Sequence, residues 1–168
     1  MRNRLSLFLA LVLSVAMIGL TGRASAQSSP APAAAPSPLA TADGEASGMQ
    51  IQIKQLKRVS GNAVMLGFEI INNSDSPFKV NGALLPVGDC CRTDVSGVYL
   101  VDLAGKKKYE VVRDSDKNPV CSRDFPDIAP KSSANLWAKF PAPPDNVQKL
   151  GIVVPHFLPM DDVPLAAQ

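Results

Sequence analysis

The segment AVMLGFEI, residues 63–70, alternates large apolar side chains with smaller or polar ones. The apolar set recurs at every second position, as Val64, Leu66, Phe68 and Ile70. Because successive side chains of a β-strand point to opposite faces, this period predicts a strand with one buried face. The segment NNSDSP that follows, residues 72–77, consists of residues that favour turns, so we expect the strand to end there.

Six further short strands are expected on either side of this one. They are residues 50–57, 78–84, 97–103, 109–113, 135–140 and 149–154. No segment sustains a helical period, and 15 prolines are scattered along the chain. Seven short strands separated by turns predict an all-β fold, an immunoglobulin-like antiparallel sandwich. A small barrel stays open as the alternative, because the number of strands does not separate open sheets from closed ones.

The first 26 residues have the three parts of a secretory signal peptide. Arg2 and Arg4 make a positive start, residues 5–20 are mostly apolar, and Ala24-Ser25-Ala26 supplies the small residues of a cleavage site. The apolar run is short of the roughly 20 residues that a spanning helix needs. We therefore expect cleavage after Ala26, export to the periplasm or the exterior, and no membrane span in the mature chain.

Residues 27–48 differ in composition from the rest of the chain. Four prolines are spaced among alanine and serine, and Leu39 is the one large apolar residue. Such a stretch buries too little apolar surface to offset the entropy of ordering it. We expect a disordered Pro/Ala/Ser-rich linker over 27–48, and a single folded domain over 49–168.

The charge of the chain does not indicate a nucleic-acid partner. The whole sequence has 17 basic and 15 acidic side chains, and the expected signal peptide contains three of the arginines. The mature chain is then left with 14 basic and 15 acidic side chains, a net charge of −1. Nucleic-acid binding needs a sustained basic surface, so the expected partner is instead a protein of the envelope or the exterior.

Three longer segments are similar to other proteins: LGFEIINNSDSPFKV (66–80), VSGVYLVDLAGKKKYEVVRDSD (95–116) and LWAKFPAPPDNVQKLGIVVPHFLPMDDVPL (136–165). Together they resemble a family of secreted bacterial immunoglobulin-like modules, some attached to peptidoglycan-anchoring domains of outer-membrane-protein-A type. The resemblance implies the fold and an exported location, and it brings no catalytic residues. The family has two closely spaced cysteines after an Asp-rich turn, whereas only Cys121 follows Asp114 and Asp116 here. No anchoring domain is expected either, so a wall-anchoring role is not carried over.

Three cysteines in an exported chain favour a disulfide. The expected bridge joins Cys121 to Cys91, with Cys90 as the alternative to Cys91. Neighbouring residues on a strand point opposite ways, so only one of that pair can readily face Cys121. The remaining cysteine is expected to be an ordinary free thiol, and a disulfide-linked dimer through it stays open.

No motif of a catalytic or metal site is complete. His156 is the single histidine, and no nucleophile motif accompanies it, so no enzyme activity, cofactor or metal is predicted. Asp114, Asp116 and Asn118 match the first half of a calcium loop, but Pro119 stands where glycine is required. A polar turn is expected there instead. The large aromatic side chain of Trp137 is expected in the core.

These features predict a non-enzymatic exported binding or structural module that presents loops or an edge strand to its partner. The candidate partner surface consists of Lys106, Lys107, Lys108, His156 and Met160. The alternative is a periplasmic thiol-redox or metal-handling protein that uses Cys90, Cys91, Cys121 and His156.

Overall fold

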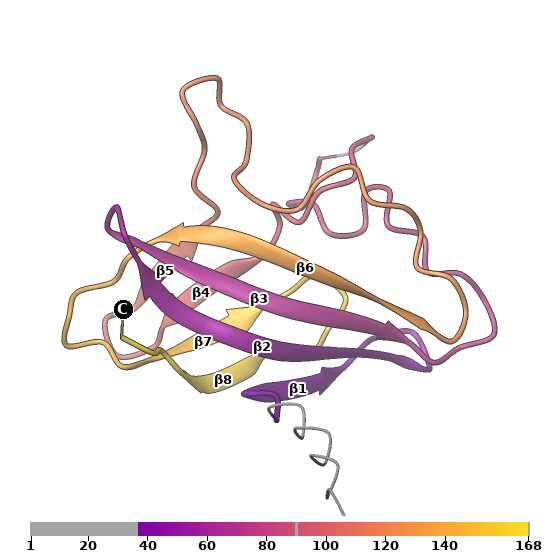
Figure 1. Ribbon diagram of the computed structural model, residues 1–168, viewed down its shortest axis with the longest axis horizontal. Coiled ribbons are helices and arrows are strands. Elements are labelled where there is room, and N and C mark those ends of the chain that lie inside the picture. Colours follow the sequence, from indigo (N-terminus) through magenta and orange to yellow (C-terminus); the bar gives the residue numbers. More distant parts are fainter. Residues whose placement is uncertain (1–36, 90, 168) are drawn as a thin grey trace, which may run out of the picture. The chain divides into compact units, whose positions relative to one another are not determined.

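The computed structural model describes residues 37–89 and 91–167, which form eight strands in two antiparallel sheets of four (Figure 1). The first sheet has the order β1-β2-β3-β6, with β1 Ala40–Asp43, β2 Met49–Val59, β3 Ala63–Asn72 and β6 Ser132–Pro141. The second has the order β5-β4-β7-β8, with β4 Tyr99–Asp102, β5 Lys107–Glu110, β7 Lys149–Val153 and β8 Met160–Pro164. The described residues include no helix that could cross a membrane. The prediction of an all-β fold is confirmed.

Strand β3 carries the alternation that the sequence predicts. Val64, Leu66, Phe68 and Ile70 are almost completely buried, and they belong to a hydrophobic core to which both sheets contribute. Leu100 of β4 and Ile152 of β7 pack into the same core from the second sheet. Fully burying side chains of this size stabilises a fold by roughly 1.5–3 kcal/mol each, so β3 is a principal source of stability.

Strand β2 departs from strict alternation at one point. Ile51 and Ile53 are buried, and the next buried residue is Leu56 rather than Gln55. The pairing of β2 with β3 shifts between Ile53 and Gln55, which marks a β-bulge that includes Lys54. A bulge places one extra residue in one strand, and so it returns the apolar side chain of Leu56 to the core face.

Six of the seven predicted strands are present, and the prediction for residues 78–84 is wrong. Phe78 makes only an isolated bridge with Ile128, and the chain then turns. Gly82 has φ of 79°, a conformation that suits glycine, and Ala83 N donates to the carbonyl oxygen of Val80 at 3.1 Å. Strands β1 and β8 were not predicted, and with them the described residues form eight strands.

The predicted linker boundary at residue 48 is also wrong. Within that range, β1 pairs with β2 from Ala40 opposite Ile53 to Asp43 opposite Gln50. An edge strand of small residues is held mainly through its backbone, so it needs little of the apolar surface that the linker argument required. The expected signal peptide and the linker up to residue 36 lie outside the described residues.

Other backbone segments cover the outer edges of the first sheet beyond β1. Ala166 pairs with Lys57 of β2 in parallel, and its N–H donates to the carbonyl oxygen of Leu56 at 2.9 Å. On the opposite edge, Ser122 N donates to the carbonyl oxygen of Trp137 in β6 at 2.9 Å. An edge that is already paired cannot accept another strand there. The remaining surfaces for a partner therefore include the outer faces and the loops.

Candidate functional site

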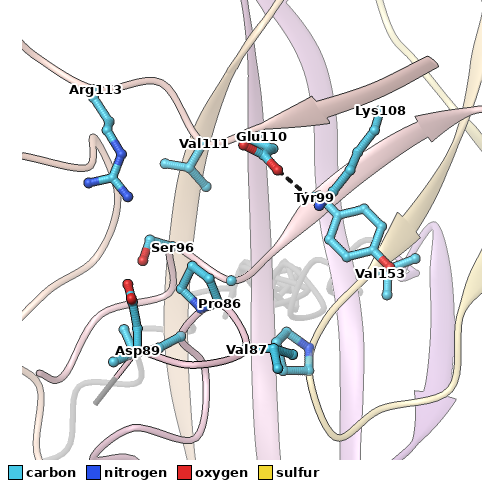
Figure 2. Close-up of a pocket in the computed structure, with 13 residues that line it drawn as sticks. Pro86, Val87, Asp89, Ser96, Tyr99, Lys108, Glu110, Val111, Arg113 and Val153 are labelled. Carbon is cyan, nitrogen blue, oxygen red and sulfur yellow. Dashed lines mark hydrogen bonds and ion pairs between the residues drawn. The ribbon is translucent and has the colours of Figure 1, made fainter. Parts of the chain in front are cut away.

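A hollow of about 720 Å³ lies over the outward face of the second sheet, and we call it the groove (Figure 2). Tyr99 of β4 lines it, opposite Glu110 of β5 and Val153 of β7 in the strand register. These side chains point outward because their neighbours along the strands, such as Leu100, point into the core. The strand alternation that buries one face thus supplies the floor of the groove.

Lys108 forms the charged wall of the groove beside Tyr99. Its Nζ lies 4.2 Å from the centroid of the Tyr99 ring and 2.9 Å from Glu110 Oε1. Figure 2 shows the lysine side chain alongside the ring, with its ion pair to Glu110. A cation over an aromatic face is attracted by the ring quadrupole, so this arrangement holds both side chains in place at the surface.

The opposite wall is the loop that contains Pro86 and Val87. Val87 is fully exposed, although it is apolar. Gly97 allows this loop to lie close to the start of β4, because a Cβ atom there would come within 2.5 Å of the Leu85 carbonyl group. The bond from Gly97 N to the carbonyl oxygen of Leu84, at 2.9 Å, fixes the approach. The close approach at Gly97 therefore positions the loop that exposes the Val87 side chain to solvent.

A buried carboxylate anchors the base of this wall. Asp94 is 3% exposed, and its two oxygens accept hydrogen bonds from Ser96 N at 2.9 Å and Arg92 Nε at 3.1 Å. Arg92 also reaches Asp89 at 3.2 Å. The buried Oγ of Ser96, which lines the groove, has no hydrogen-bond partner within residues 37–89 and 91–167. Buried hydroxyl groups normally have a partner, so this oxygen is an unsatisfied polar atom beneath the surface of the groove.

A second hollow of about 490 Å³ adjoins the groove, and we call it the cationic pocket. Arg113 lines both hollows. Figure 2 places Arg113 across the groove from Tyr99 and Val153. The cationic pocket is also lined by Arg92, Lys117 and Arg123, together with Cys91, Asp94 and Asp124 among others.

The candidate partner surface predicted from the sequence is not one surface. Of the three lysines, only Lys108 lines the groove, while Lys107 lies over the Tyr109 ring at 5.1 Å. Lys106 occupies a turn position with φ of 51°. Met160 is 5% exposed and packs in the core, so its assignment to a partner surface is wrong. The burial of Met160 could not be derived from an alternation along β8, because that strand was not predicted.

His156 lies at a different hollow, of about 310 Å³, whose lining includes Met49, Phe78 and Phe157. Its Nδ1 is 2.8 Å from Glu45 Oε2, and both side chains are exposed. This side-chain contact joins the segment after β1 to the segment before β8. His156 therefore contacts the part of the chain that was expected to be a linker.

The described cysteines are in contrasting surroundings. Cys121 is 5% exposed and packs in the core, where burial raises the pKa of its thiol. Cys91 is exposed and lines the cationic pocket. Both are free thiols, so the preferred bridge between them is not formed, because one side chain faces the core and the other faces solvent. Cys90 lies outside the described residues.

The turn at Asp114 has the predicted polar character. Asp114 Oδ1 accepts hydrogen bonds from the backbone N–H of Asp116 at 2.9 Å and of Asn118 at 2.8 Å. The bond from Asn118 N is the main reason that the pKa of Asp114 lies below its ordinary value. In the described part of the chain, no three His, Cys, Asp or Glu side chains are grouped so that they could hold a metal ion.

Trp137 is on the surface rather than in the core. It is 40% exposed, because Leu136 and Ala138 on either side take the buried positions of β6. The prediction for Trp137 rested on its size and is wrong.

Sequence reasoning missed Tyr99, Val87 and Arg113 as groove residues, although the predicted strand at 97–103 placed Tyr99 and Leu100 on opposite faces. Comparison with protein families, with curated proteins and with solved structures finds no match to the chain.

Proposed function

We propose that the protein is an exported, non-enzymatic immunoglobulin-like module that binds a segment of a partner protein in the groove. The export rests on the signal peptide expected over residues 1–26, with cleavage after Ala26. The binding role rests on the groove and on the exposed apolar side chain at its wall.

The strand pairing supports the immunoglobulin-like part of the proposal. When β2 to β8 are counted as seven strands, the second pairs with the fifth (β3 with β6) and the third pairs with the sixth (β4 with β7). These two pairings are those of strands B with E and C with F in immunoglobulin domains. The fourth strand, β5, pairs with β4, as the added strand C′ does in variable-type domains.

The observation that carries the binding role is the exposed Val87 on the wall opposite Lys108, in a groove that Tyr99 also lines. Protein interfaces combine an apolar and aromatic centre with a polar rim. Here Tyr99 and Val87 supply aromatic and apolar surface, and Lys108, Glu110 and Arg113 supply charged side chains. The tyrosine also brings large contact area at little entropic cost, which is why tyrosine is common at binding hot spots.

The backbone pairing of β2 and β6 disfavours strand addition along these two strands. The outer edge of β2 pairs with β1 and with Ala166, and that of β6 bonds with the segment at Val120 and Ser122. The partner segment is accordingly held by side-chain contacts over the face of β4, β5 and β7.

The test is capture of a partner from envelope extract by three immobilised proteins: wild type, Val87→Asp and Leu103→Asp. Leu103 is a matched control because it is also exposed and apolar, but it does not line the groove. We expect a protein that wild type and Leu103→Asp retain and that Val87→Asp loses. Retention by Val87→Asp, or no retained protein at all, overturns the proposal.

A further inference from the structure

Four cationic and two acidic side chains line the cationic pocket. Arg92 pairs with Asp89 and Asp94, at 3.2 Å and 3.1 Å. The other cations of the pocket, Arg113, Lys117 and Arg123, have no carboxylate within 4.0 Å in the described residues.

Only one further acid, Asp124, lines the pocket. Asp114, on the same hairpin as Arg113, does not line the pocket; its carboxylate accepts hydrogen bonds from Asp116 and Asn118 and is attracted by Arg123. Three unpaired cations therefore face one unpaired acid. This local excess contrasts with the expected mature chain, whose net charge is −1.

The three cations are carried by segments that are bonded in place. Arg113 Nη1 donates to the carbonyl oxygen of Lys117 at 2.9 Å, and Asp114 N donates to the carbonyl oxygen of Asn118 at 2.9 Å. The backbone of Arg123 forms an isolated antiparallel β-bridge with that of Asp94, and Asp124 N donates to the carbonyl oxygen of Thr93 at 2.8 Å. Like charges repel when they converge, so an arrangement that holds them together is well suited to an anion.

We infer that the cationic pocket binds an acidic stretch of the same protein segment that occupies the groove. The two arginines offer planar forks of N–H donors, which match the geometry of a carboxylate. Arg113 lines both hollows, so a segment that leaves the groove past this residue brings its next side chains to Lys117 and Arg123. The inference rests on the proposed function, because it assigns the chemistry of the partner that the groove receives.

The probe is a fluorescein-labelled hexaglutamate peptide, titrated into the purified protein at low and at high salt. The test variant is Arg113→Gln/Lys117→Gln/Arg123→Gln. The control is Lys57→Gln/Lys131→Gln/Lys149→Gln, which removes the same charge from exposed lysines that line neither the groove nor the cationic pocket. We expect the test variant to bind at least about tenfold more weakly, the control to stay within about twofold of wild type, and salt to weaken binding.

Three results overturn the inference: no binding by wild type, equal losses in the two triple variants, or displacement of the peptide by equimolar inorganic phosphate. The last result would mean a site for a small anion. Arg123→Gln alone provides the same comparison should the triple variant unfold, and its binding must then be weaker than that of Lys57→Gln. If the peptide test fails while a partner is still captured in a Val87-dependent way, the inference of an acidic partner segment is wrong and the proposed binding in the groove stands. Loss of Val87-dependent capture removes the proposed function itself.

Discussion

Cys91 and Cys121 are chemically alike and lie in opposite surroundings. Because Cys121 is buried and its pKa is raised, we expect iodoacetamide to modify Cys91 in the native protein and Cys121 only after unfolding. Mass spectrometry of peptides from a Cys90→Ser variant separates the two sites. The control is the same reaction in denaturant, where both must react. Equal native rates would show that Cys121 is accessible and that its place in the core is wrong.

Glu69 is one of the carboxyl groups whose pKa is lowered in the folded protein. Its pKa lies below the ordinary value of 4.5 mainly because of the hydrogen bond from Lys54, at 2.8 Å, and then that from Ser133. A carboxylate with a lowered pKa stabilises the fold above its unfolded-state pKa, and this stabilisation is lost as the pH falls through the folded-state value.

We therefore expect Glu69→Gln to lower the free energy of unfolding by about 0.5–1 kcal/mol at neutral pH. The difference from wild type should shrink as the pH falls below 4.5. Urea denaturation at several pH values measures it, and Lys54→Met should remove much of the same pH-dependent part. A difference that is constant with pH would assign the effect to packing instead of charge.

For single residues, the burial of a side chain was predicted correctly where the apolar alternation was clear. It was predicted wrongly where the prediction rested on the size or the type of the side chain. Val64, Leu66, Phe68 and Ile70 are buried as expected. Trp137 was judged by its size, although Leu136 and Ala138 beside it already defined the buried face of its strand. The convergence of Arg113 with Arg123 depends on tertiary pairing, which no local pattern contains.

Strand β1 is the element with the clearest test of its own. A chain that starts at Met49 lacks the backbone bonds between β1 and β2. It also lacks the bond from Leu39 N to the Ile53 carbonyl oxygen, at 2.7 Å, and the bond from Leu158 N to the Asp43 carbonyl oxygen, at 3.1 Å. Each net hydrogen bond is worth roughly 0.5–1.5 kcal/mol, so we expect a loss of a few kcal/mol.

The measurement is urea denaturation of chains that start at Ser37 and at Met49. The chain from Ser37 is the control, because it keeps β1 and lacks the part of the expected linker that precedes residue 37. Equal stability of the two chains would restore the linker boundary at residue 48.

Elements were predictable from the sequence when they carried their own apolar alternation. β1 and β8 lack it: β1 reads Ala-Thr-Ala-Asp, and β8 has two adjacent aspartates between its buried residues. Both strands form through their pairing with a neighbour, β1 with β2 and β8 with β7. The bulge at Lys54 is similar, since the pairing with β3 sets the face on which Leu56 lies.

At the scale of the molecule, a single core supports both sheets, and Phe68 is among its largest completely buried side chains. We expect Phe68→Ala to lower the free energy of unfolding by about 3–5 kcal/mol, because it leaves a cavity in that core. Trp137→Ala is the control, since that residue is 40% exposed, and it should cost much less. Denaturation followed by circular dichroism compares the two. Similar costs would mean that Trp137 supports the core after all.

The pairing of β1 with β2 also determines how the domain responds to mechanical load. The two strands form a hairpin, and the chain enters it at Ala40, opposite Ile53. A pull on the preceding segment, with the rest of the domain held, loads the bonds of this hairpin one after another from its open end. Bonds loaded singly yield at lower force than bonds loaded together, so β1 should peel away first. The seven-strand remainder, including the groove, would then stay folded while the chain lengthens.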